Sequence, residues 1–160
     1  IEEIRKESLD KLLYLCNKAQ EQNLTLGLEP IGSWEILKKG HFNSISSCLN
    51  LVKKYEHKLI IDLYHSFADT KLESFLKNSS KLGLLQFSNI KFDNNWRPTG
   101  RLILNKQNNV NNVDISKYLK TVLNRKDRIN VEFEIFQSDI KDTDPKLVIT
   151  NLKKEILELL

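Results

Sequence analysis

Methionine is absent from the 160 residues, and there are only two cysteines, three prolines and five glycines. Cys16 and Cys48 cannot form a disulfide framework, and neither has a second Cys or a His at zinc-finger spacing, so we expect two buried thiols in a reducing cytoplasm. No apolar run approaches the roughly 20 residues that cross a bilayer, which excludes a membrane span. The charged start IEEIRKESLD does not have the features of a signal peptide.

Because the chain opens on Ile1 and lacks methionine, we expect it to be part of a longer polypeptide, or a sequence from which some residues are missing. Its length fits one small domain or a piece of a larger one. With 40% hydrophobic and 29% charged residues, the composition is that of a soluble globular protein and not of a disordered tail.

Neither sign of charge is concentrated in one part of the chain. The 25 Lys and Arg are interleaved with 21 Asp and Glu, for a net charge of +4. The densest basic stretch, residues 124–128 (NRKDR), contains its own carboxylate. A surface that follows nucleic-acid phosphates would be more segregated, so the charge pattern disfavours nucleic-acid binding.

Short apolar runs alternate with segments of helical periodicity, which indicates strands alternating with amphipathic helices. The predicted strands are 24–29, 58–63, 82–88 and 129–135. The predicted helices are 2–22, 44–55, 70–78, 114–123 and 145–160, and a long Asn-rich polar connection is expected over 89–112. This alternation predicts an α/β fold with a parallel sheet in one domain over residues 1–160. The four strands fit either a small open sheet or half of an eight-stranded (β/α)8 barrel.

Each predicted strand brings an acid or an amide oxygen close to its C-terminal end. The first three strands carry Glu29, Asp62 and Gln86, and the fourth carries Glu132 and Glu134, which share a face because strand side chains alternate. A single carboxylate in this position is usually a helix cap or a member of an ion pair. Several carboxylates that meet at one rim raise one another's pKa unless a cation neutralises them, and oxygen ligands suit Mg²⁺ or Mn²⁺. The sequence therefore predicts a divalent metal site at this rim.

Four segments carry motifs of a known family in the order of the predicted strands. They are Glu29-Pro30-Ile31-Gly32-Ser33-Trp34-Glu35, Asp62-Leu63-Tyr64-His65, Gln86 within residues 84–89, and Arg97-Pro98-Thr99-Gly100. Together they resemble the C-terminal half of the xylose isomerase-like TIM barrel superfamily (AP endonuclease 2 family), in its hydroxypyruvate isomerase and ketose 3-epimerase branch. The resemblance covers nearly all of residues 5–155. It implies that the chain supplies strands five to eight of a (β/α)8 barrel.

This resemblance implies a divalent-metal-dependent isomerase or epimerase that moves a proton of a ketose or 2-hydroxycarbonyl substrate through an enediolate. One Mn²⁺, Mg²⁺ or Co²⁺ would be bound by Glu29, Asp62, Gln86 and Glu132, with Glu134 as the alternative to Glu132. Glu29 and Glu132 would also be the catalytic bases. The N-terminal half-barrel would come from the same or another chain. Dimers and tetramers are common in this branch, so a homo-oligomer is also expected.

By the same resemblance, His65 and Arg97 would bind substrate oxygens, and Glu35 would support the loop after Glu29. From the residues alone, His65 could also be a helix cap and Arg97 a surface residue. Trp34 and Trp96 are expected above the rim, either as an apolar wall over a sugar or packed within loops.

The sequence departs from the family pattern near the predicted site. Leu84 and Asn89 stand where the family usually has His and an acidic residue, and an Asn-rich insertion covers residues 105–112. Arg101 replaces the Glu of a family turn, which reverses the charge beside the site. These departures leave open an altered substrate or a catalytically inactive binding or scaffold barrel.

An endonuclease IV-like phosphodiesterase is a further alternative, because its motif after the sixth strand also resembles residues 62–68. Such an enzyme uses three metals bound largely by histidines. This chain has three histidines, at positions 41, 57 and 65, and only His65 lies near a predicted strand end.

Overall fold

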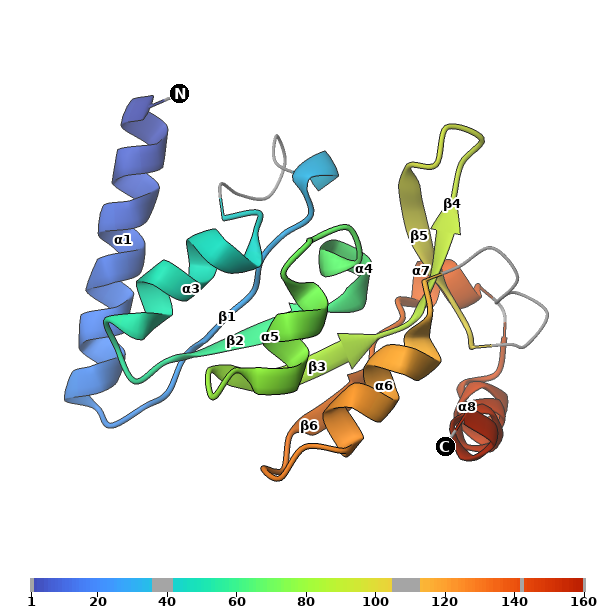
Figure 1. The fold of residues 1–160 in the computed structure, drawn as a ribbon. Coiled ribbons are helices and arrows are strands. Elements are labelled where there is room, and N and C mark those ends of the chain that lie inside the picture. The colour runs from blue at the N-terminus through green and yellow to red at the C-terminus, as the bar shows by residue number, and fades with distance from the viewer. Residues whose placement is uncertain (1, 36–41, 105–112, 142, 160) are drawn as a thin grey trace.

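The structure, a computed structural model, describes residues 2–35, 42–104, 113–141 and 143–159 (Figure 1). Its helices are α1 (Glu2–Glu21), the 3-10 helix η1 (Ser33–Glu35), α3 (Ile45–Lys53), α4 (Leu63–Ser66), α5 (Leu72–Asn78), α6 (Ile115–Leu123), α7 (Gln137–Ile140) and α8 (Pro145–Leu159). Its strands are β1 (Gly27–Leu28), β2 (Lys58–Asp62), β3 (Leu82–Phe87), β4 (Asn89–Phe92), β5 (Pro98–Leu102) and β6 (Asn130–Phe133).

Strands β1, β2, β3 and β6 form one parallel sheet in that order. Because the order follows the chain without reversing, this is the arrangement of a barrel and not of a doubly wound sheet. Asp62 pairs with Gln86, and Gln86 pairs with Glu132, so these three residues form one row across neighbouring strands. Within the described part of the chain, β1 and β6 each pair with a single strand, which leaves both edges of the sheet open.

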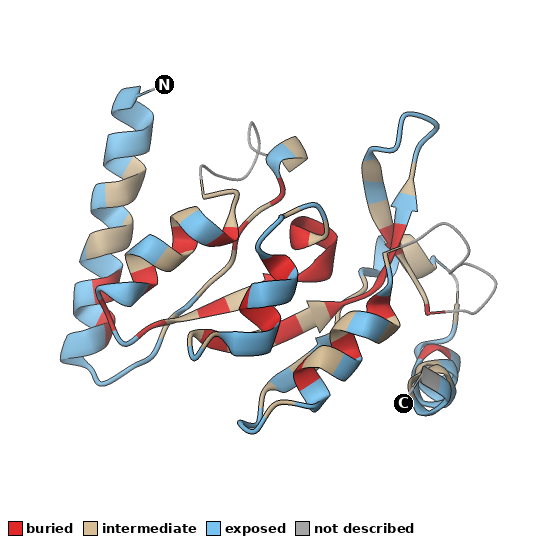
Figure 2. Cartoon of the chain, in the orientation of Figure 1, coloured by how far each residue is buried: buried red, intermediate tan, exposed pale blue. Residues whose placement is uncertain are grey.

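One face of the sheet is covered by α3, α5 and α6, and buried residues lie between these helices and the strands (Figures 1 and 2). Leu59 and Ile61 of β2 and Leu85 of β3 are wholly buried there. On the opposite face, Leu84 is half-buried and Glu132 is exposed. The described chain therefore closes the helix side of its sheet and leaves the other side open.

Local capping explains where two of the covering helices begin. The Ser44 hydroxyl accepts a hydrogen bond from Ser47 N at 3.2 Å and caps α3. The Asp114 carboxylate accepts one from Lys117 N at 2.9 Å and caps α6. Each of these caps satisfies a backbone N–H of the first turn, and each lies at the start of a helix predicted from the sequence, 44–55 and 114–123.

Cys16 of α1 and Cys48 of α3 are both buried and unpaired, as predicted. Burial raises the pKa of the Cys48 thiol to about 12. His57 connects α1 to the start of β2, because its Nδ1 accepts from Leu26 N at 3.3 Å and its Nε2 lies 3.2 Å from the carbonyl oxygen of Cys16. None of the described helices combines the length and the apolarity that a bilayer crossing needs.

The prediction of a polar connection over residues 89–112 is wrong for its first part. Strands β4 and β5 form an antiparallel hairpin in which Ile90 pairs with Arg101. The carboxylate of Asp93 closes the turn by accepting from Asn95 N at 2.8 Å and Arg97 N at 2.9 Å. The polar composition concealed this hairpin, since Asn and Asp favour turns. The Asn-rich stretch 105–112 lies outside the described residues.

Candidate metal centre

A carboxylate, a second carboxylate and an imidazole meet where β1 and β2 end. Glu29 follows β1, Asp62 is the last residue of β2, and His65 lies in α4. His65 Nε2 lies 3.9 Å from both Glu29 Oε1 and Asp62 Oδ2, and one ligand atom from each residue lies within 4.8 Å of the other two. Separations of 3.9 Å are too long for hydrogen bonds. A cation placed among the three atoms would contact all of them, and we call these residues the acid–imidazole group.

Asp62 is fully buried at the end of its strand. Its Oδ1 accepts a hydrogen bond from Tyr64 N at 2.9 Å, which caps the short helix α4 and places His65 one turn further on. Burial raises the pKa of the Asp62 carboxyl to about 6, although the neighbouring Arg101 guanidinium acts in the opposite direction. The residue is thus a helix cap and an ion-pair member as well as part of the group.

Arg101 of β5 reaches into this cluster from the hairpin. Its Nη2 donates to Asp62 Oδ2 at 2.5 Å and to Glu134 Oε2 at 3.1 Å, and only 5% of its side chain is exposed. The guanidinium carbon lies 4.4 Å from the ring centre of Tyr64 and 4.6 Å from that of Phe136, which is within the range of cation–π attraction. The ion pairs join the hairpin to the ends of β2 and β6.

Gln86 and Glu132 lie beside the acid–imidazole group in the register of the sheet. Gln86 Nε2 donates to Glu132 Oε2 at 3.3 Å. Gln86 Oε1 is buried and finds no hydrogen-bond partner among the described residues. A buried amide oxygen without a partner is uncommon, and it is a ligand type that hard cations accept. The row from Asp62 to Glu132 therefore fits a divalent cation in donor type.

The segment after Glu29 places an indole ring against His65. Trp34 of η1 is half-buried, and its ring centre lies 6.4 Å from that of His65 and 5.3 Å from that of Phe67. A Cβ atom on Gly32 would collide with the Trp34 ring, so this approach needs a glycine. Glu35, the last residue of η1, is partly exposed beside Tyr64, whose pKa is raised mainly by burial and further by the Glu35 charge.

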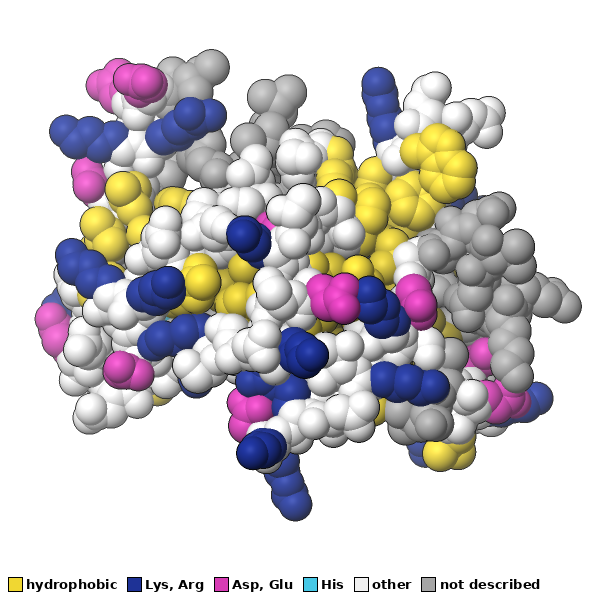
Figure 3. Space-filling view, viewed as in Figure 1, with side chains coloured by type: hydrophobic (Ala, Val, Ile, Leu, Met, Phe, Trp, Pro, Cys, Tyr) yellow, Lys and Arg dark blue, Asp and Glu magenta, His cyan; other side chains and the backbone are white. Residues whose placement is uncertain are grey.

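Arg97 and Trp96 lie in the turn of the hairpin and do not join the acid–imidazole group. Arg97 is exposed, and Trp96 is 68% exposed with a left-handed φ of 59°. Phe92 connects this turn to Phe67, with ring centres 5.9 Å from Trp96 and 5.5 Å from Phe67. Hydrophobic side chains gather over the hairpin on the face drawn in Figure 3, whereas Lys and Arg are scattered over that face without forming a stripe.

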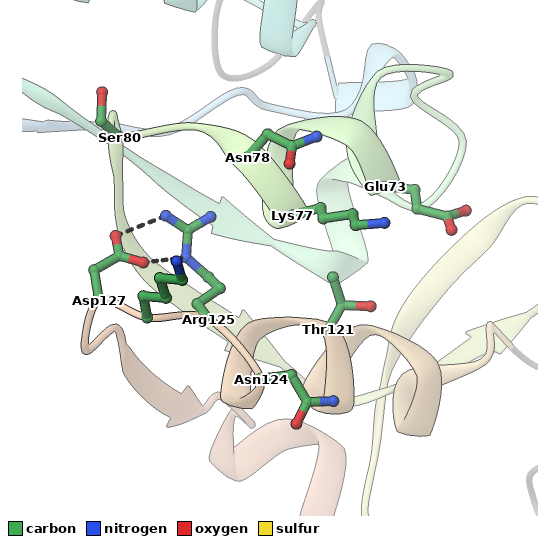
Figure 4. A pocket seen from close by; sticks show the side chains of 9 residues that line it. Glu73, Lys77, Asn78, Ser80, Thr121, Asn124, Arg125 and Asp127 are labelled. Atoms are coloured by element: carbon green, nitrogen blue, oxygen red, sulfur yellow. Dashed lines mark hydrogen bonds and ion pairs between the residues drawn. The ribbon is translucent and has the colours of Figure 1, made fainter.

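A pocket of about 720 Å³ lies at the other end of the sheet, where α5 and α6 lead into β3 and β6 (Figure 4). Arg125 lines this pocket and donates to both carboxylate oxygens of Asp127 at 2.7 and 2.8 Å. It also donates to the carbonyl oxygens of Leu76 and Ser79. Since its donors are used within the fold, we assign this arginine a structural role.

No family model and no curated protein sequence matches the chain significantly. Solved structures do match it. A xylose isomerase domain-containing protein from Salmonella typhimurium LT2 superimposes with a TM-score of 0.71 at 16% identity, over 91% of this chain and 54% of that protein. The chain has the fold of a xylose isomerase-like TIM barrel.

Other xylose isomerase-like barrels agree with this assignment. The IolI protein with a bound zinc atom has a TM-score of 0.71 at 19% identity, over 99% of this chain and 56% of IolI. D-psicose 3-epimerase from Clostridium cellulolyticum H10, solved with D-tagatose, has a TM-score of 0.56 at 17% identity, over 97% of this chain and 55% of the epimerase. The chain spans about half the length of these barrels, which confirms the predicted partial (β/α)8 barrel.

Proposed function

We propose that this xylose isomerase-like half-barrel belongs to a divalent-metal-dependent isomerase or epimerase that acts on a ketose or a 2-hydroxycarbonyl compound. The acid–imidazole group is the observation that carries the proposal. It lies at the carboxyl ends of the strands, where (β/α)8 enzymes have their active sites. Two barrels of the same fold support the substrate class and the metal, since one has a bound zinc and the other is an epimerase solved with a ketose.

The metal ligands in this proposal are Glu29, Asp62, Gln86 and Glu132, with His65 beside them. Bound there, Mn²⁺, Mg²⁺ or Co²⁺ would polarise the substrate carbonyl and stabilise the negative charge that develops on deprotonation. The buried Gln86 Oε1 and the 3.9 Å spacing around His65 Nε2 support this ligand set.

Glu29 and Glu132 are the proposed catalytic bases. The side chain of Glu29 is 31% exposed and Glu132 is exposed on the open face of the sheet, so a substrate can reach both. One carboxylate would remove the proton next to the carbonyl, and a proton would return to the neighbouring carbon or to the other face of the same carbon. The Trp34 ring beside His65 would keep water from one side of the substrate.

His65, Arg97 and Glu35 would position the substrate. His65 is buried in the acid–imidazole group and would donate a hydrogen bond to a substrate oxygen. Arg97 would reach the substrate from the exposed turn of the hairpin, and Glu35 would hold the loop that carries Trp34. In this proposal the substrate lies between the row of strand-end residues and the hairpin.

Four further strands would complete the barrel. Among the described residues, β1 and β6 each pair with one strand of the sheet, and an open parallel edge needs a partner. We propose that an N-terminal half-barrel from the same or another chain supplies the partner strands, and that the assembly works in the cytoplasm.

The endonuclease IV-like alternative has few ligands in the described structure. His57 is held at the start of β2 by Leu26 and Cys16, away from the carboxyl ends of the strands. Among the described histidines, this leaves His65 alone for a site that would need several. No observation favours a trinuclear centre.

The test is an assay of the full chain with Mn²⁺ and a panel of small ketoses in D₂O, with mass spectrometry to detect deuterium next to the carbonyl. We expect exchange and isomerisation in the wild type, and a loss of about 10²-fold or more in Glu132→Gln or Glu29→Gln. Glu73→Gln is the matched control, because Glu73 is an exposed acid on α5 paired with Lys117. Exchange that survives both glutamate variants would exclude these residues as bases.

A further inference from the structure

The oxygen that the acid–imidazole group offers to a cation already has a cation beside it. Asp62 Oδ2 lies 3.9 Å from His65 Nε2, and the same atom accepts the hydrogen bond from Arg101 Nη2 at 2.5 Å. The other oxygen of the same carboxylate, Oδ1, accepts a hydrogen bond from Tyr64 N. Both oxygens of this buried carboxylate are therefore engaged within the chain.

The guanidinium is held in this place from several sides. Glu134 accepts from the same Nη2, and the rings of Tyr64 and Phe136 pack against the guanidinium carbon. An arginine keeps its positive charge across the physiological pH range and matches carboxylates geometrically. A charge so fixed cannot move away from Asp62 without breaking two ion pairs and two aromatic contacts.

A divalent ion among Glu29, Asp62 and His65 would thus lie near a fixed positive charge. Two like charges a few ångströms apart repel strongly where water is largely excluded, and Arg101 is 4% exposed. The guanidinium also neutralises the Asp62 carboxylate, which would otherwise attract the ion. Both effects lower the affinity of the group for a metal.

We propose that Arg101 supplies part of the positive charge that a metal would otherwise bring to Asp62, and that it thereby determines how tightly the acid–imidazole group binds a divalent cation. The wild-type site then binds metal weakly, and loss of the guanidinium turns it into a tight site. This inference rests on the proposed function for the location of the metal, but it concerns metal affinity and not turnover. Arg101 is in this sense a positioning residue, which acts through Asp62.

The experiment measures Mn²⁺ binding to the metal-free full chain from the electron paramagnetic resonance signal of the free ion. We expect Arg101→Gln to bind Mn²⁺ at least about tenfold more tightly than the wild type. Adding Asp62→Asn to Arg101→Gln should abolish the tight binding. Arg101→Lys keeps a positive charge and should remain as weak as the wild type. Arg125→Gln, which removes an equally buried arginine at the other end of the sheet, should leave the affinity unchanged.

If Arg101→Gln unfolds without metal, the midpoint of its thermal unfolding is measured with increasing Mn²⁺, and we expect a larger rise than in the wild type. Equal or weaker binding in Arg101→Gln, or an Arg101→Gln chain that Mn²⁺ neither binds nor stabilises, overturns the inference. Binding by Arg101→Lys as tight as by Arg101→Gln also overturns it, because the charge would then not be the cause. Tight metal binding without any ketose turnover would leave the inference standing and remove the proposed function.

Discussion

The two ends of the parallel sheet each contain a nearly buried arginine, and the two arginines have different kinds of partner. The side chains of Arg101 and Arg125 are 5% and 6% exposed. Arg125 binds backbone carbonyls and a carboxylate, Asp127, that is 53% exposed. Arg101 binds Asp62, a carboxylate with no exposure at all.

The exposure of the acid, more than that of the arginine, decides what each ion pair does. Asp127 remains hydrated, so its hydrogen bond from Arg125 simply lowers the pKa of its carboxyl. Asp62 is dehydrated, so its pKa rises despite Arg101. At one end of the sheet, Arg125 connects neighbouring segments through hydrogen bonds. At the other end, the buried charge of Asp62 is tolerated only because the Arg101 cation lies beside it.

The largest effect should come from removing the cation at the carboxyl end. We expect Arg101→Gln to lower the free energy of unfolding by about 3–5 kcal/mol at pH 8 without metal, because the buried Asp62 carboxyl loses the cation that compensates its charge. Urea unfolding measures this loss. The double variant Arg101→Gln, Asp62→Asn should recover much of it. A loss below about 1 kcal/mol in the single variant would show that Asp62 is hydrated in solution.

The next largest effect should be a difference between Asp62 and Asp127 in how each makes stability depend on pH. The folded pKa of Asp62, about 6, lies above its ordinary value of 3.8, so protonation favours the folded chain. This contribution, about 3 kcal/mol at most, is fully present below pH 4 and is lost as the pH rises through 6. Urea unfolding in EDTA between pH 4 and 8 tests it against Asp62→Asn, which should lack the change.

Asp127 should behave in the opposite way, since its folded pKa is lowered. Its contribution is present above its ordinary pKa and lost as the pH falls through the lowered value. Carboxyl carbon NMR of the folded chain should therefore show Asp62 titrating well above Asp127. The reverse order would contradict the comparison.

A smaller loss is expected from Arg125→Gln. The variant removes donors from the carbonyl oxygens of Leu76 and Ser79, which should lower the free energy of unfolding by about 1–3 kcal/mol. Unlike Arg101→Gln, it should give the same loss at pH 5 and pH 8, because no buried acid is left behind. A strong pH dependence of this loss would break the distinction between the two ends.

The smallest effect is expected from Asp127→Asn. An exposed ion pair contributes little, and Arg125 keeps its carbonyl partners without it. We expect no measurable shift of the urea midpoint. A clear destabilisation would show that the exposed acid holds Arg125 in place.

Much of the fold followed from local patterns. The four parallel strands and the caps at Ser44 and Asp114 could be predicted because period and capping are encoded within a few residues. Asp62 could be placed at a strand end for the same reason. The β4–β5 hairpin was missed because its polar residues 93–95 outweighed the alternation of Ile90 and Phe92.

The partners of Arg101 could not be predicted from the sequence. Arg101 reverses the charge of the family pattern at its position, but Asp62 lies 39 residues away and Glu134 33 residues away. Nothing in a single sequence pairs residues at such separations. Membership of His65 in the acid–imidazole group was missed for a different reason: the helix cap at Asp62 turns the chain so that residue 65 returns toward residue 29, which only the geometry of α4 reveals.

The buried thiol of Cys48 can report when the helix layer opens. A side chain with no exposed surface and a pKa near 12 does not react with an alkylating reagent while α3 stays on the sheet. Any label found on residue 48 therefore records a molecule whose helix layer has opened. The rate of labelling, followed by mass spectrometry, would measure how often the helix layer opens in every variant above.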